Sequence, residues 1–152
     1  MSERSETPEP STDIERLIVD IFTMADVVCT IATPDRRFVA ELMGRTTPYF
    51  HGDRWKVETA GWHLHARLSA IRRVRFVRAP SDHFAGQDAL SIRLEDDHGG
   101  VLLTAYFIKL YDPENRPLAG RFACWEELRA RYGGRDDVLV KDGAIGSAAS
   151  AA

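Results

Sequence analysis

The pattern of apolar and polar residues divides the chain into a helix, a series of short strands and a second helix. Thr12 and Glu15 have the spacing of a capping box, in which the two side chains satisfy free amides at a helix start. Apolar residues then recur every three or four positions, which predicts a helix over residues 13–24 with one buried face. The same spacing predicts a helix over 123–132, ended by Gly133-Gly134.

Between the two helices, apolar and polar residues alternate, as they do in strands with one buried face. Turn signals at Pro34-Asp35, Gly52-Asp53 and Asp97–Gly100 predict the points where strands reverse. The apolar run 101–108 is typical of a central strand covered on both faces. We therefore expect an α+β fold, in which a meander-like antiparallel sheet of about seven to eight strands is covered by an N-terminal and a C-terminal helix.

The length of 152 residues is that of a single domain with a substantial core. Residues 1–11 are rich in Ser, Glu and Pro, which predicts a disordered segment. Residues 12–134 carry all the predicted helices and strands and form the predicted domain. Residues 135–152 end in small side chains, and we expect them to form a mobile tail.

The stretch Gly61–Arg78 is the centre of the predicted sheet, because it combines strand alternation with a cluster of basic side chains. Its first half places His63, His65 and Arg67 on one polar face, since side chains two apart on a strand share a face. Its second half follows a short connection at Ser69-Ala70. That half contributes the arginines Arg72, Arg73, Arg75 and Arg78. We expect both halves to form one basic wall that carries the imidazoles.

Two imidazoles at this spacing can offer ligands to a metal, or one axial ligand to a haem iron. The alternative is a pair of histidines that are merely exposed or hydrogen-bonded on a polar face, and a zinc site lacks a third ligand at close spacing. The guanidinium groups of Arg67, Arg73 and Arg75 match carboxylates, unless acids on neighbouring strands already pair with them. Tyr49 and His51 lie in a predicted loop that either closes over a planar ligand or packs on the core.

Composition and charge narrow the classes of partner. The chain is 44% hydrophobic and 28% charged, as ordinary globular proteins are, and its net charge is −3. A negative molecule is repelled by a phosphate lattice, so we expect neither nucleic acid nor a membrane as partner, and the local arginines favour a small anionic ligand. The two cysteines form no CxxC motif, and neither a signal peptide nor a membrane-spanning run is evident, which predicts a cytoplasmic location.

The order of segments resembles the repeat unit of the HemS/ChuX haem-utilisation proteins. The resemblance rests on GWHLHARLSAIRRVRFVRAP, a loop, and ALSIRLEDDHGGVLLTAYFIKLYD. These give a histidine-bearing strand, the serine-containing strand around Leu90-Ser91-Ile92, the D-x-x-G turn at Asp97–Gly100 and an apolar strand, over roughly residues 55–112. The resemblance implies a cytoplasmic haem-binding protein, often dimeric when it has a single unit, that carries haem or takes part in its breakdown.

Two hypotheses from different classes follow. In the first, the protein carries haem or a related tetrapyrrole. His63 or His65, or less readily His51, then ligates iron, and arginines neutralise the propionates. In the second, the arginine-rich face is a non-catalytic interaction or scaffold surface for a partner protein or a second copy in a homodimer. An enzyme acting on a small anion ranks last, because GxSxG, P-loop and GxGxxG motifs are missing and no catalytic residue stands out.

Overall fold

A computed structural model describes residues 9–146, and the predicted behaviour of residues 1–8 and 147–152 lies outside this part of the chain. The two predicted helices are present as α1 (Asp13–Thr23) and α2 (Ala119–Arg131). The strands are β1 (Val27–Ala32), β2 (Val39–Leu42), β3 (Tyr49–His51), β4 (Arg54–Glu58), β5 (His63–Arg67), β6 (Arg73–Pro80), β7 (Asp88–Glu95), β8 (Val101–Phe107), β9 (Asp137–Lys141) and β10 (Ala144–Ile145). Short 3₁₀ turns are η1 (Leu68–Ala70) and η2 (Asp82–Phe84). The predicted α+β class is confirmed.

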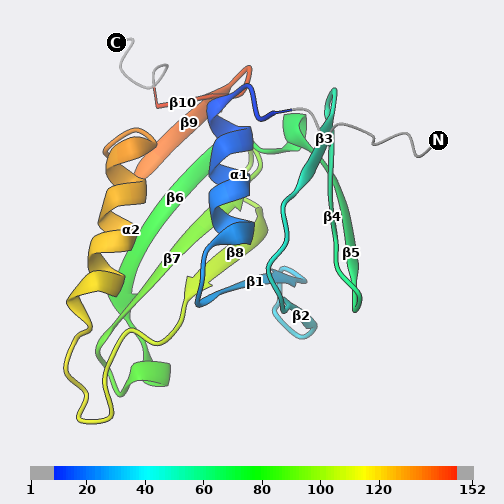
Figure 1. Ribbon diagram of the computed structural model, residues 1–152. Helices are drawn as coiled ribbons and strands as arrows, with labels where there is room; N and C mark the ends of the chain where they lie inside the picture. Colours follow the sequence, from blue (N-terminus) through cyan, green and yellow to red (C-terminus); the bar gives the residue numbers. More distant parts are fainter. Residues whose placement is uncertain (1–8, 147–152) are drawn as a thin grey trace.

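The strands form two antiparallel sheets. Seven strands follow the order β10-β9-β6-β7-β8-β1-β2, and three others follow the order β3-β4-β5. Both helices lie on the same face of the seven-stranded sheet, and the three-stranded sheet stands to one side of α1 (Figure 1). The large sheet confirms the expected antiparallel meander, whereas the separate small sheet was not predicted. No helix within residues 9–146 is long and apolar enough to cross a membrane.

Helix α1 fills the angle between the two sheets. Its apolar stripe is buried, and the ring of Phe22 lies 5.9 Å from Trp55 and 6.3 Å from Trp62, both of the small-sheet region. The predicted capping box is present in altered form. The hydroxyl of Thr12 accepts from the amide of Glu15 at 3.3 Å, while the Glu15 carboxylate accepts from the amide of Ser11 at 3.1 Å. These caps fix where α1 begins.

Helix α2 packs on the strands that lie beside α1. Trp125 meets Phe76 edge-on at 6.1 Å between ring centroids, and its indole nitrogen donates to the carbonyl of Ser91 at 3.1 Å. Beyond this helix the structure differs from the expected mobile tail, because residues 137–145 form β9 and β10. Strand β9 pairs with β6, and Val138 and Val140 alternate with exposed residues so that their side chains are buried. The burial of these two side chains and the pairing with β6 hold the segment on the sheet.

The chain changes sheets between β5 and β6, at η1. The Asp53 carboxylate accepts from both the amide of Ser69 at 2.8 Å and its hydroxyl at 2.7 Å, and the Asp53 carbonyl accepts from the amide of Leu68 at 2.8 Å. Ile71, just beyond the turn, is buried in the core. These contacts redirect the chain from the small sheet into the large one. The expectation that both halves of Gly61–Arg78 share one wall is therefore wrong.

Candidate ligand-binding site

The outer face of the three-stranded sheet gathers polar side chains in two cross-strand rows. Alternation turns Phe50, Trp55 and Val57 toward the core, where all three are buried. The side chains between them point outward. One row joins Tyr49, Lys56 and His65, and the next joins His51, Arg54 and Arg67, because these residues face one another in the strand register. The tight Gly52-Asp53 turn between β3 and β4 sets that register.

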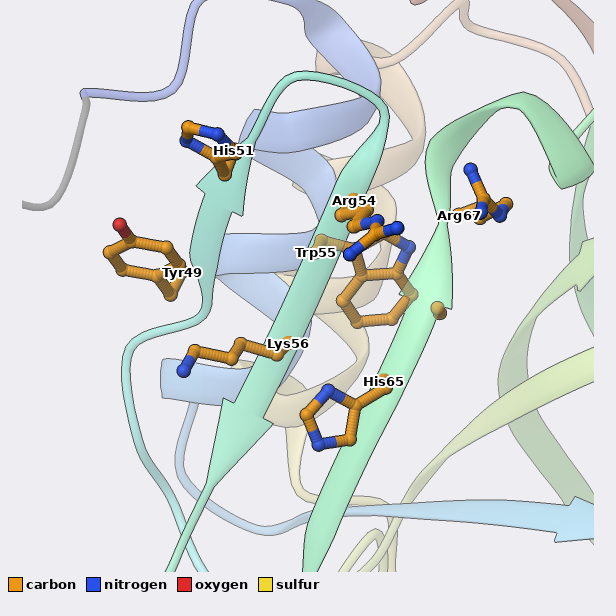
Figure 2. A pocket seen from close by; sticks show the side chains of 8 residues that line it. Tyr49, His51, Arg54, Trp55, Lys56, His65 and Arg67 are labelled. Carbon is orange, nitrogen blue, oxygen red and sulfur yellow. The ribbon is translucent and has the colours of Figure 1, made fainter.

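A hollow of about 590 Å³ lies over these rows. Its lining residues are Tyr49, His51, Arg54, Trp55, Lys56, His65, Ala66 and Arg67. Figure 2 shows the polar side chains of this set on three neighbouring strands, with the ring of Trp55 lying between β4 and β5. Four of the residues that the sequence singles out, Tyr49, His51, His65 and Arg67, are thus brought together. Tyr49 and His51 belong to β3 rather than to the predicted loop, because they pair with β4.

His63 lies on the same face as His65, but it is not among the residues that line the hollow. The two rings are parallel within 2° at 6.5 Å between centroids, and Nδ1 of His63 is 3.6 Å from Oε1 of Glu58. Parallel rings do not converge on one ion in this arrangement. Within residues 9–146, no group of three or more His, Cys, Asp and Glu side chains could hold a metal ion. A haem iron differs from such a centre, because it takes only one or two axial ligands from a protein.

Cations dominate the charge of this face. Arg54 and Arg67 lie directly opposite each other on paired strands, and the Lys56 ammonium is 5.3 Å from the centre of the Tyr49 ring. Two carboxylates lie next to the rows, Glu58 opposite His63 in the register and Asp53 in the turn before Arg54. A hydrogen bond from Lys56 lowers the pKa of Glu58, and hydrogen bonds from Ser69 lower the pKa of Asp53. Opposed cations repel each other, so an anion bound between them would be stabilised.

The structure places Arg73 and Arg75 elsewhere, in β6 of the large sheet. Nε of Arg73 is 3.0 Å from Oδ1 of Asp137 in β9, and Nη1 of Arg75 is 3.7 Å from Oε2 of the buried Glu95. Neither arginine lines the hollow. Sequence reasoning did not select Arg54 and Lys56 as site residues, although they alternate with Trp55 just after the Gly52-Asp53 turn and so lie on a polar face. The strand pairing of β4 with β5 was the missing information.

Comparison with known proteins shows which family and which solved structures the chain resembles. A family model matches residues 15–132, and no curated protein matches the chain. A structure described as the heme binding protein ChuX shares 16% identity at a TM-score of 0.62, covering 84% of this chain and 77% of that one. A crystal structure of ChuX gives 15% identity, a TM-score of 0.61, and coverage of 76% and 70%.

A third similar structure is protein AGR_C_4470 from Agrobacterium tumefaciens, with 20% identity and a TM-score of 0.54. The match covers 69% of this chain but 58% of that protein. At these identities the structures establish a common fold and nothing about what this chain binds. The family model spans most of the domain, and its range includes α2, all of α1 but its first two residues, and the strands that carry the hollow. The chain therefore belongs to the ChuX/HemS-like family.

Proposed function

We propose that this protein binds haem or a closely related tetrapyrrole on the outer face of the β3-β4-β5 sheet and acts as a cytoplasmic haem carrier. The observation that carries the proposal is the hollow in which an exposed imidazole, His65, stands beside Lys56, Arg54 and Arg67. The family supports it, because a solved structure with the same fold is described as a heme binding protein. The size of the hollow lies within the range of small-molecule and cofactor sites.

The side chains of this face have separate roles in the proposal. His65 lies within the hollow and supplies the axial imidazole, with His63 and His51 as the neighbouring alternatives. Arg67, Arg54 and Lys56 pair with the propionates, because guanidinium and ammonium groups form charge-assisted hydrogen bonds with carboxylates. The Tyr49 ring offers a flat apolar surface beside them. The proposal leaves out Arg73 and Arg75, whose carboxylate partners lie in the large sheet.

Hemin titration of the purified protein tests the proposal. The wild type should show a shifted Soret band that saturates at one hemin per chain, and His65→Ala should weaken binding at least tenfold. His63→Ala should have a smaller effect. His98→Ala is the matched control, because its side chain is 89% exposed in the β7–β8 turn, away from the hollow. A spectrum of free hemin alone, or identical titrations of all three variants, would refute the proposed site.

The propionate contacts have a test of their own. Arg67→Gln and Lys56→Gln should each weaken hemin binding about three- to tenfold, because each removes one charge-assisted hydrogen bond. The same variants should not differ from wild type toward haem dimethyl ester, which lacks the carboxylates. Lys141→Gln, on β9 of the other sheet, serves as the control. Equal losses with both ligands would show that these cations do not contact the propionates.

A second candidate function concerns the face of the large sheet opposite the helices. Phe76 packs on α2, so its neighbour Arg75 points to the other face. The register continues a polar row across that face in the order Asp137, Arg75, Arg93, Thr104, Thr30 and Glu41. One half carries Asp137 followed by Arg75 and Arg93, and the other half ends in Glu41. A second copy turned by a two-fold axis that passes between Thr104 and Thr30 would set Arg93 of each copy opposite Glu41 of the other, which favours a homodimer on this face.

Light scattering during size exclusion tests this homodimer. The wild type should elute with twice the mass of one chain, Glu41→Lys should elute as a monomer, and Glu41→Lys with Arg93→Glu should regain the dimer. Glu114→Lys is the control, since Glu114 is 69% exposed in a loop away from this face. A wild-type monomer at every concentration would contradict the proposed interface.

A further inference from the structure

A second, apolar cavity lies behind β5, on the side away from the hollow. It measures about 350 Å³ and separates the inner face of the small sheet from the large one. We call it the inter-sheet slot. Its walls are mostly apolar and include Ile31, Trp55, Leu64, Ala66, Ala70, Ile71, Leu94, Leu102 and Leu103, together with the polar residues His65 and Arg67. Mostly apolar cavities of this size, with few polar groups, are typical of small-molecule sites.

The buried polar group of the slot is the indole nitrogen of Trp55, whereas the two other polar lining residues, His65 and Arg67, are exposed. Trp55 is 4% exposed, and its Nε1 has no hydrogen-bond partner. The other two tryptophans are satisfied, because Nε1 of Trp62 donates to the Met43 carbonyl at 2.6 Å and Nε1 of Trp125 donates to Ser91. Trp55 faces Ala66 across the strand pair, and Figure 2 shows its ring nitrogen on the side of β5. The small Ala66 side chain leaves that donor beside the slot.

We propose that the inter-sheet slot binds a small, uncharged, largely apolar molecule whose single acceptor takes the hydrogen bond from Trp55 Nε1. A buried donor without a hydrogen-bond partner costs free energy, so a ligand that supplies an acceptor removes that cost and binds more tightly. A neutral ligand is favoured, because the buried donor Trp55 Nε1 is neutral and does not compensate for burying a charge, while the Arg67 side chain that also lines the slot is 61% exposed. The volume suits a substituted aromatic ring, since an apolar cavity of about 150 Å³ already admits benzene. The slot shares Trp55, His65, Ala66 and Arg67 with the lining of the hollow, but the proposal does not require haem to be bound there.

Two probes of equal shape test the role of the acceptor. Acetophenone carries a carbonyl where α-methylstyrene carries a methylene group, so the pair differs only in the acceptor. With ¹⁵N-labelled protein, acetophenone should shift the indole resonance of Trp55 in a saturable way and bind at least threefold tighter than α-methylstyrene. The resonances of Trp62 and Trp125 should move little. No saturable shift with either probe, or equal affinity for both, would overturn the proposal.

Two variants separate the slot from nonspecific contact. Trp55→Phe should abolish the preference for acetophenone, with Trp62→Phe as the matched control that keeps it. Ala70→Phe should block both probes, because Ala70 lines the slot and its exposed position tolerates a larger side chain. If Trp55→Phe does not fold, Ala70→Phe decides alone. Binding of both probes by Ala70→Phe as tightly as by wild type would place them outside the slot and refute the proposal.

Discussion

At the scale of single residues, Asp53 shows how one carboxylate fixes the site. It follows the glycine of the β3–β4 turn, and it holds Ser69 through two hydrogen bonds at the point where β5 ends. Arg67, the last residue of β5, lies with its Nη1 3.8 Å from the same carboxylate. The hairpin turn, the sheet-changing turn and one cation of the hollow therefore depend on a single side chain.

Asp53→Ala should lower the free energy of unfolding at pH 7, and the difference from wild type should narrow in acid. Hydrogen bonds from Ser69 depress the pKa of Asp53 below its ordinary value of 3.8 in the folded state. The stabilisation is therefore fully present above that value and is lost as the pH falls through the folded pKa. Urea unfolding at pH 7, 5 and 3 measures this, with Asp97→Ala, in an exposed turn, as control. A difference that is constant from pH 7 to 3 would contradict the prediction.

Arg75 and Arg73 lie on the same strand, β6, and each faces a carboxylate, one of them buried and the other half exposed. Arg75→Leu should destabilise the protein by about 1–3 kcal/mol, because it leaves the buried carboxylate of Glu95 without its counter-charge. Arg73→Leu should cost only about 0–1 kcal/mol, since its partner Asp137 is half exposed. Urea unfolding compares the two, and hemin titration should show no effect of either. A weaker hemin affinity in both variants would contradict this prediction and show that these arginines contribute to haem binding.

At the scale of elements, helices α1 and α2 are tied together by polar groups as well as by apolar packing. The hydroxyl of Tyr132 donates to Oδ2 of Asp20 at 2.5 Å, and Nη1 of Arg131 lies 3.2 Å from the same oxygen. Burial and the neighbouring Asp20 raise the pKa of Tyr132, so its hydroxyl stays protonated at neutral pH. Asp20 lies on α1, and both partners lie at the end of α2.

Tyr132→Phe should therefore lower the free energy of unfolding by about 1.5–2 kcal/mol, because the hydrogen bond to a carboxylate is lost in a buried position. Arg131→Gln is the control and should cost under about 1 kcal/mol, because its side chain is half exposed. Guanidinium or urea unfolding followed by circular dichroism measures both. Equal losses in the two variants would show that charge, rather than the buried hydroxyl, joins the helices.

The elements themselves were largely predictable, because their signals are local. Helical spacing and the Thr12 cap located α1 within a residue or two, and alternation placed His63, His65 and Arg67 on one exposed face. What sequence reasoning missed is non-local. The change of sheet at Ser69 depends on a carboxylate sixteen residues earlier, and the hollow depends on β3 pairing with β4. Periodicity specifies the face of a side chain, but not the strand beside it.

At the scale of the whole molecule, the C-terminal strands close the large sheet. Strand β9 covers the edge of β6 and β10 pairs with β9, so that Val138, Val140 and Ile145 complete the core. The β10 segment also contacts the start of α1, where the amide of Ile14 donates to the carbonyl of Gly143 at 3.0 Å. The sequence suggested a tail here, because small residues follow and the strands are short. The partner of β9 is β6, which lies roughly sixty residues earlier in the chain. A local pattern of apolar and polar residues does not indicate a pairing over such a separation.

We therefore propose that the folding unit extends to Ile145, and two truncations test this boundary. A chain ending at Gly134 loses three buried side chains worth about 1.5–3 kcal/mol each, a loss comparable with the total stability of a typical domain of about 5–15 kcal/mol. It should fail to unfold cooperatively in urea. A chain ending at Gly146 keeps both strands and should unfold as the full chain does. If the shorter chain retained a cooperative transition at the wild-type midpoint, β9 and β10 would be an addition to the core rather than part of it.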